Sequence, residues 1–180
     1  MRLIVGLSLS AGVAISALAQ GAEASTLCKA DETVVFSCST GAHMASLCAS
    51  KDLSASQGYL QYRFGKNDDP EFVYPAELKH PTGLFAPGML MFSGGGGAYL
   101  QFSNGAYGYT IFSAVGKWGA NGGSADASGV AVAKDGKEFA NFPCHGEAAG
   151  ELGPDFFEKS GLKMPDAAGD FDIPQAFLPK

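Results

Sequence analysis

Residues 98–112 read AYLQFSNGAYGYTIF, and this stretch decides the fold of the chain. Two runs rich in aromatic and β-branched side chains, 98–102 and 107–112, flank the dipeptide Asn104-Gly105. Asn-Gly between two such runs is the strongest short-range signal for a β-hairpin, because a tight turn of this kind places two residues at positive φ. The stretch therefore predicts two antiparallel strands joined by a turn centred on Asn104 and Gly105.

The alternation of short β-rich runs and turn residues continues on both sides of this hairpin. Strand-like runs occupy 33–38, 45–49, 58–64, 71–74 and, interrupted by proline as in an edge strand, 84–92. Downstream, Asp135-Gly136 separates 129–133 from 138–144 and predicts a second tight hairpin.

Only residues 154–159 have the pattern of a helix, and Gly161 would end this helix. We therefore expect an all-β fold with a short helix near the C-terminus. Its strands would form an antiparallel sandwich or a barrel-like sheet built from consecutive hairpins.

Composition excludes several classes of protein. The chain has 180 residues, of which 46% are hydrophobic and 17% charged, so it is too apolar for a disordered protein and has the length of one domain. Twelve basic residues against eighteen acidic ones give a net charge of −6. Without a block of lysine or arginine, the sequence predicts no binding to nucleic acid. A charged partner would be basic.

The first 24 residues have the pattern of a secretory signal peptide. A positive start is followed by an apolar run, and small-x-small cleavage patterns end at Ala19 and Ala24, of which we prefer Ala24. The alternative is a membrane anchor, because the apolar run is only slightly shorter than a spanning helix. We expect cleavage, a periplasmic location without a membrane anchor, a single β domain over 25–160 and a loose tail over 161–180.

Four cysteines follow the signal peptide: Cys28, Cys38, Cys48 and Cys144. An even count in an exported chain predicts two disulfides, and three pairings are possible. Metal binding is the competing interpretation, but the sequence has no C-x-x-C pair, so we predict no metal site.

No motif marks an enzyme. The glycine run 94–97 precedes a predicted strand and lacks the following helix and lysine of a phosphate loop. The acidic group Asp68, Asp69 and Glu71 surrounds a proline and is typical of a solvated turn. A carboxylate pair of a glycoside hydrolase would meet only in space and stays open as an alternative. We expect no catalytic residues and no cofactor.

Aromatic side chains next to turns are the remaining candidates for function. Tyr107 follows the predicted turn, Tyr99 follows the glycine run, and Trp118 lies in a glycine-rich loop, where we expect it to pack. Tyrosine on a rigid tip is a typical anchor for protein binding. Tyr107 either projects past the turn or packs on the sheet, because alternation puts it on the same face as Tyr109.

At these residues the chain resembles the bacterial periplasmic inhibitors of invertebrate-type lysozyme. The resemblance runs from about Cys28 to Phe157 and is carried by 46–50, 58–65, 91–102, 104–112 and 116–119. It implies an all-β fold, often dimeric, that inhibits lysozyme by inserting loops into the catalytic cleft.

The resemblance also implies an inhibitory loop with the motif Ser-Gly-x-Tyr. The matching residues here are Asn104, Gly105, Ala106 and Tyr107, with Asn104 in place of the serine and Ser103 one position earlier. An asparagine amide can donate the hydrogen bond that the serine would make to a catalytic carboxyl. Ser93-Gly94 with Tyr99 is a second candidate loop.

The expected function is therefore a periplasmic inhibitor of lysozyme, with an invertebrate-type lysozyme as partner and a homodimer as a possible assembly. An envelope-binding or immunity protein directed at another peptidoglycan hydrolase is the first alternative. A secreted hydrolase is the second.

Overall fold

The two predicted hairpins belong to the larger of the two sheets in the computed structural model, which describes residues 25–66, 69–165 and 171–179. Its five strands are β5 (Ala86–Phe92), β6 (Gly95–Asn104), β7 (Tyr107–Gly116), β8 (Ala125–Lys134) and β9 (Lys137–Pro143). The smaller sheet consists of β1 (Glu32–Ser39), β2 (Met44–Ser50), β3 (Leu60–Lys66) and β4 (Asp69–Tyr74). The predicted signal peptide lies outside the described residues. Among the described residues, no helix is long and apolar enough to cross a membrane.

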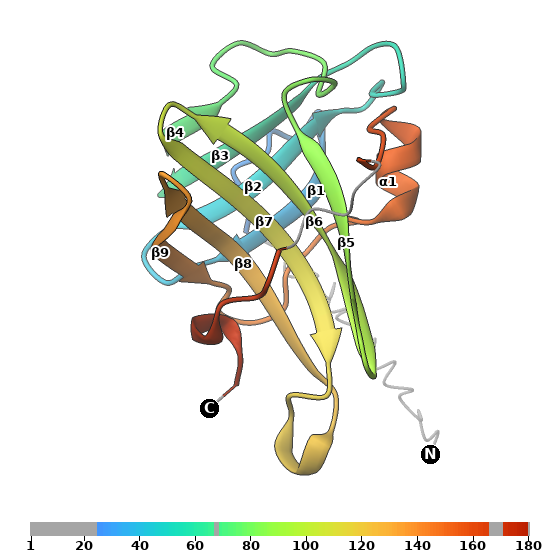
Figure 1. Cartoon of the computed structure of the whole chain (residues 1–180). Coiled ribbons are helices and arrows are strands. Elements are labelled where there is room, and N and C mark those ends of the chain that lie inside the picture. Colours follow the sequence, from blue (N-terminus) through green and yellow to red (C-terminus); the bar gives the residue numbers. More distant parts are fainter. Residues whose placement is uncertain (1–24, 67–68, 166–170, 180) are drawn as a thin grey trace, which may run out of the picture.

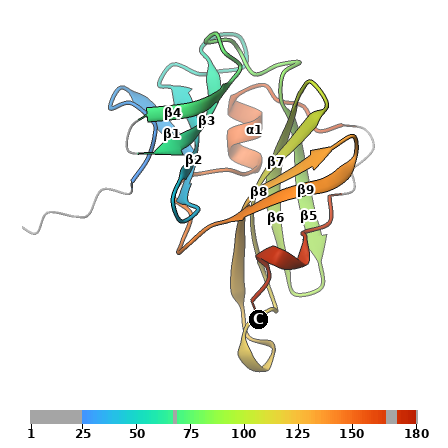
Figure 2. The same cartoon turned by 90° about the vertical axis from the view of Figure 1, so that its left-hand side faces the viewer.

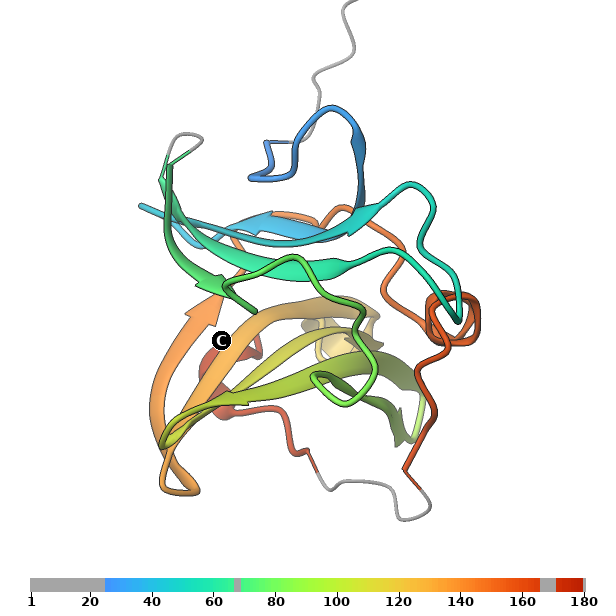
Figure 3. The ribbon, with the colours of Figure 1, turned by 90° about the horizontal axis from the view of Figure 1, so that it is seen from above.

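Both sheets are antiparallel and follow the order of the sequence (Figure 1). They stack as two layers (Figure 3), with α1 (Pro154–Lys159) beside them, so the fold is a sandwich and not a closed barrel. Two short 3₁₀ helices, η1 (Ala120–Gly122) and η2 (Gln175–Phe177), complete the described elements. The all-β prediction and the short helix are confirmed.

One detail of the predicted hairpin was wrong. Strand β6 continues through Asn104, which pairs with Tyr107, so the two central turn residues are Gly105 and Ala106. Only Gly105 has positive φ, at 61°, as in a type II′ turn with glycine at its first central position. This register places Phe102 opposite Tyr109, and their rings stack with centroids 4.7 Å apart. The downstream turn has Asp135 and Gly136 both at positive φ, as predicted.

The main core lies between the two sheets, where alternate side chains of each strand point inward. It includes the fully buried Leu47, Leu60 and Tyr62 of one sheet and Leu100 and Ile111 of the other. The chain leaves β9 and runs along the outer edge of β1, where Ala149 exchanges two backbone hydrogen bonds with Ser37.

A second apolar cluster lies on the outer face of the five-stranded sheet. Tyr99 and Phe112 belong to this cluster, and Phe171 and Phe177 of the C-terminal segment pack on it. The C-terminal segment crosses this face of the sheet (Figure 1). The Phe112 ring lies 4.8 Å from that of Phe177 and 5.3 Å from that of Phe171. The tail was predicted to be loose, but residues 171–178 pack here, because these rings would otherwise be exposed to water.

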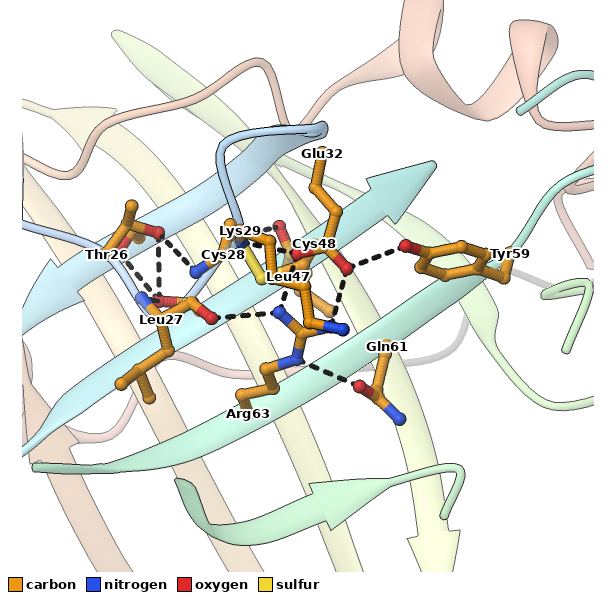
Figure 4. Close-up of a disulfide and its surroundings, with 12 residues drawn as sticks. Thr26, Leu27, Cys28, Lys29, Glu32, Leu47, Cys48, Tyr59, Gln61 and Arg63 are labelled. Atoms are coloured by element: carbon orange, nitrogen blue, oxygen red, sulfur yellow. Dashed lines mark hydrogen bonds and ion pairs between the residues drawn. A yellow bond between two sulfur atoms is a disulfide. The ribbon is translucent and has the colours of Figure 1, made fainter. Parts of the chain in front are cut away.

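The N-terminal segment covers the outer face of the four-stranded sheet by polar contacts (Figure 4). A disulfide joins Cys28 to Cys48 of β2. The Arg63 guanidinium of β3 donates two 2.6 Å hydrogen bonds to the Glu32 carboxylate and one of 2.9 Å to the Leu27 carbonyl. Arg63 is 3% exposed, so both charges of the ion pair are withdrawn from water.

The second disulfide, Cys38–Cys144, ties β1 to the segment that follows β9. The prediction of two disulfides is confirmed. Of the three possible sets of pairings, the structure has Cys28–Cys48 with Cys38–Cys144.

Burial of Glu32 by itself would raise its pKa. The hydrogen bonds from Arg63, from the Lys29 backbone N–H and from the Tyr59 hydroxyl, together with the charge of Arg63, outweigh burial and lower the pKa below its ordinary value of 4.5. Burial and the bond to this carboxylate raise the pKa of Tyr59 to about 12. At pH values well above the ordinary pKa, Glu32 is ionised in both the folded and the unfolded chain. Its contacts then contribute fully to the free energy of unfolding. This contribution is lost as the pH falls through the lower, folded value.

We predict that Glu32→Gln lowers the free energy of unfolding at pH 7 by about 3–5 kcal/mol, because it leaves the Arg63 charge buried without its partner. Acidification from pH 7 to pH 3 should destabilise this variant less than the wild type. Urea unfolding at the two pH values measures both effects. Glu77→Gln is the control, because Glu77 pairs with Lys79 on the surface and the change should have little effect. Equal acid sensitivity of the wild type and the Glu32 variant would contradict this assignment.

Candidate functional site

The tip of the β6–β7 hairpin is exposed and held in place by its neighbour. Ser103, Asn104, Gly105 and Ala106 are all exposed, and a Cβ atom added to Gly105 would meet no atom within 4 Å. The backbone N–H of Asp135, in the β8–β9 turn, donates a 2.9 Å hydrogen bond to the Ala106 carbonyl. The predicted loop therefore lies at a protruding tip whose backbone is fixed from the side.

Tyr107 packs on the sheet and does not project past the turn. Its half-buried ring meets the Phe139 ring of β9 edge-on, with centroids 5.3 Å apart. The Lys134 ammonium lies 5.3 Å from the centroid of the same Tyr107 ring. Of the two alternatives that the sequence left open, the structure has the packed one, and Tyr107 acts as a support beside the tip.

Behind Tyr107, an apolar pocket of about 310 Å³ opens between the two sheets. Seven aromatic residues line it together with Val132 and Ala140: Tyr62, Phe64, Phe72, Tyr107, Tyr109, Phe139 and Phe142. Burial, and to a smaller extent Tyr107, raise the pKa of Tyr109. The described residues that line the pocket carry no carboxylate, imidazole or thiol.

The residues of the second candidate loop, Ser93, Gly94 and Tyr99, do not lie together. Ser93 and Gly94 form the β5–β6 turn, with Gly94 at φ 79°, at the end of β6 that lies away from the β6–β7 tip (Figure 1). Tyr99 is not in this turn: it lies within β6, is 2% exposed and packs on Phe171, with centroids 5.5 Å apart. The glycines 95–97 belong to the strand, so the structure does not bring Tyr99 to a loop surface.

Trp118 packs as expected. Its ring lies 5.1 Å from that of Phe92, beside the apolar cluster on the outer face of the five-stranded sheet.

Other clusters of reactive side chains have structural partners. In the described part of the chain, Cys28, Glu32 and Cys48 come close enough to ligate a metal, but the two cysteines are bonded to each other. Of the acidic group at the β3–β4 turn, Asp68 lies outside the described residues. Glu71 contacts His43 and Lys66, at 3.2 and 3.6 Å.

The sequence interpretation missed the residues that support the tip. Asp135, Lys134 and Phe139 all belong to the β8–β9 hairpin, which was predicted but not connected with the β6–β7 tip. Connectivity could have shown the link, because successive antiparallel hairpins of one sheet bring alternate turns to the same end.

Comparison of the chain with protein-family models, with curated proteins and with solved structures finds no match.

We predict that Tyr107 and Phe139 stabilise the fold jointly. A double-mutant cycle with Tyr107→Ala and Phe139→Ala should give a coupling free energy of about 1 kcal/mol, the usual contribution of an edge-on aromatic pair. Tyr107→Phe should keep the coupling, because it keeps the ring. The measurement is urea unfolding of the wild type, the two alanine variants and their double variant, and of Tyr107→Phe with and without Phe139→Ala. Strictly additive effects of the two alanine changes would show that the contact does not stabilise the fold.

Proposed function

We propose that this protein is an exported inhibitor of lysozyme that inserts the β6–β7 tip into the catalytic cleft of the enzyme. The observation that carries the proposal is the exposed tip 103–106, whose backbone the neighbouring hairpin fixes through the 2.9 Å bond from Asp135 to Ala106. A loop that is already ordered loses less conformational entropy on binding, which favours tight inhibition.

The side chains of the tip suit such a cleft. Ser103 and Asn104 offer a hydroxyl and an amide that can donate hydrogen bonds to the paired carboxyl groups of a glycoside hydrolase. Gly105 and Ala106 add little bulk and therefore let the tip enter a narrow groove. In this proposal Tyr107 holds the tip from behind by packing on Phe139 and contacts the rim of the cleft at most with its edge.

Two properties of the whole chain support the same proposal. The two disulfides indicate an oxidising compartment outside the cytoplasm, where such an inhibitor would meet its target. The net charge of −6 favours association with a basic enzyme. We place the protein in the periplasm and expect the partner to be a lysozyme of the invertebrate type.

The sharpest test is an isosteric change at the tip. Asn104→Asp turns a donating amide into a carboxylate that would face the carboxyl groups of the enzyme, and like charges repel. We expect the inhibition constant for an invertebrate-type lysozyme to rise at least tenfold, which corresponds to about 1.4 kcal/mol. Lysis of bacterial cell walls by the lysozyme, with increasing amounts of the purified protein, measures this constant.

The matched control is Asn121→Asp, which adds the same charge to an exposed asparagine in the β7–β8 connection. Because the two turns lie at opposite ends of β7 (Figure 2), the control should inhibit like the wild type. An Asn104→Asp protein that inhibits normally would exclude the tip from the interface. Inhibition of another wall hydrolase but of no lysozyme would identify an immunity protein instead.

We also predict that association slows as salt is added. The attraction between an acidic inhibitor and a basic enzyme is screened beyond about 8 Å at physiological ionic strength. The association rate should therefore fall between low and high salt, while the dissociation rate changes less. Stopped-flow or biosensor measurements over a range of salt concentrations would show it. An unchanged association rate would mean that the net charge does not contribute to encounter.

A further inference from the structure

The apolar pocket behind Tyr107, here called the aromatic pocket, lies where each sheet has a β-bulge. Its nine lining residues are Tyr62, Phe64, Phe72, Tyr107, Tyr109, Val132, Phe139, Ala140 and Phe142. The extra residue of the bulge is Phe139 in β9 and Glu71 in β4. A bulge bends its strand and is common beside binding and active sites. The bends of β4 and β9, which both line the pocket, favour a gap that a regular sandwich would close.

One almost fully buried polar side chain lines the aromatic pocket. Tyr62 is 2% exposed, and its hydroxyl forms no hydrogen bond with the described residues. Among these residues, Asn141 Oδ1 is the one side-chain oxygen or nitrogen that is both fully buried and unpartnered. The Tyr62 oxygen therefore keeps some accessible surface, and the pocket is the open space that Tyr62 lines. A hydroxyl at this depth destabilises the protein unless a partner reaches it through the pocket.

Two further phenol groups lie near this hydroxyl. Burial raises the pKa of Tyr62, and the neighbouring Tyr109 adds to that rise. Tyr107 has the same smaller effect on the pKa of Tyr109, so the three phenol groups lie within electrostatic range of one another around the pocket. With its pKa raised, Tyr62 stays protonated at neutral pH. Its hydroxyl can therefore donate a hydrogen bond to a bound molecule.

The walls of the aromatic pocket disfavour a charged ligand. None of the described residues that line it carries a charge, so an ion would lose its hydration without gaining a countercharge. Aromatic rings can attract a cation through their faces, but neighbours already cover several of these faces. Phe72 and Phe102 stack on Tyr109, with centroids 5.3 and 4.7 Å away, and His43 stacks on Phe64 at 4.9 Å. The ligand that fits is therefore neutral.

The shape of the walls and the donor at their base describe this ligand further. Seven of the nine lining residues are aromatic, and aromatic rings pair favourably with another ring edge-on or offset. A rigid ring also loses less conformational freedom on binding than a flexible chain. A carbonyl oxygen on such a ring would accept the hydrogen bond that the Tyr62 hydroxyl lacks.

We infer that the aromatic pocket is a binding site for a small, neutral, planar ring compound that bears a hydrogen-bond acceptor, and that the Tyr62 hydroxyl donates to this acceptor. This inference goes beyond the proposed function and does not depend on it. The inhibitory contact would be made by residues 103–106, which do not line the pocket.

Two ligands that differ only in the acceptor test this inference. 1-Indanone is a flat bicyclic ketone, and indane is the same ring system without the carbonyl. Two-dimensional NMR of the purified chain should show saturable shifts around Tyr62, Tyr109 and Phe139 with 1-indanone. Tyr62→Phe removes only the hydroxyl. It should weaken the binding of 1-indanone about fivefold, the net effect of one hydrogen bond, and leave the binding of indane unchanged.

Two further variants separate the pocket from the rest of the fold. Ala140→Phe fills the pocket and should abolish saturable binding of both ligands. Tyr74→Phe is the matched control, because it removes a hydroxyl from a tyrosine that does not line the pocket, and it should bind both ligands like the wild type. If Ala140→Phe does not fold, the comparison of Tyr62→Phe with Tyr74→Phe still decides.

The inference is overturned if 1-indanone produces no saturable shifts, if the shifts lie elsewhere, or if Tyr62→Phe changes the binding of both ligands equally. Tighter binding of benzoate, an anion, or of hexan-2-one, a flexible ketone, would also overturn it. Tyr62→Phe should inhibit lysozyme like the wild type, and Asn104→Asp should bind 1-indanone like the wild type. Failure of the inference and failure of the proposed function are therefore recognised separately.

Discussion

The register between β6 and β7 is the constraint on which the other features of the molecule depend. Both faces of this strand pair are covered, so every side chain has an assigned side: Leu100 and Ile111 face the inner core, and Tyr99 and Phe112 face the outer cluster. A slip by one residue would exchange the two faces and bury neither set correctly. The turn at Gly105 fixes this register, and the same register places the exposed tip.

The outer faces of the two sheets are covered through different kinds of contact. The outer face of the four-stranded sheet carries Arg63, which needs hydrogen-bond acceptors and a countercharge. The N-terminal segment supplies the Leu27 carbonyl, and Glu32 at the start of β1 supplies the carboxylate. The outer face of the five-stranded sheet carries rings, and the C-terminal segment needs only apolar side chains. The N-terminal cover is consequently specific in geometry and sensitive to acid, whereas the C-terminal cover depends on buried area.

Local signals explain what could be predicted from the sequence. Asn104-Gly105 and Asp135-Gly136 mark hairpins through backbone preferences that act within a few residues, and both hairpins are present. The glycine run was harder to interpret. Glycine in the β6 strand reflects a close approach between strands, since a Cβ atom at Gly97 would clash with the Ser113 carbonyl oxygen. Only the three-dimensional pairing shows that approach.

Long-range features escaped prediction for a related reason. The packed tail has no period of its own, and its phenylalanines gain a role only from the apolar face that they cover. Likewise the contact between Tyr107 and Phe139 joins strands that are not neighbours in sequence. The two disulfide pairings depend on which side of each strand a cysteine occupies, which an even count does not reveal.

The connectivity of the disulfides has a consequence for how the chain acquires its structure. The bonds interleave, Cys28 with Cys48 and Cys38 with Cys144, so the first two cysteines to leave a ribosome or an export channel are not partners. An oxidant that joined cysteines in order of emergence would link Cys28 to Cys38 and trap β1 in a wrong connection. Correct maturation therefore requires the four-stranded sheet to form before oxidation, or thiol–disulfide exchange to repair the early bond. Without such exchange, Cys38 must stay reduced until Cys144, 106 residues further along the chain, has been delivered.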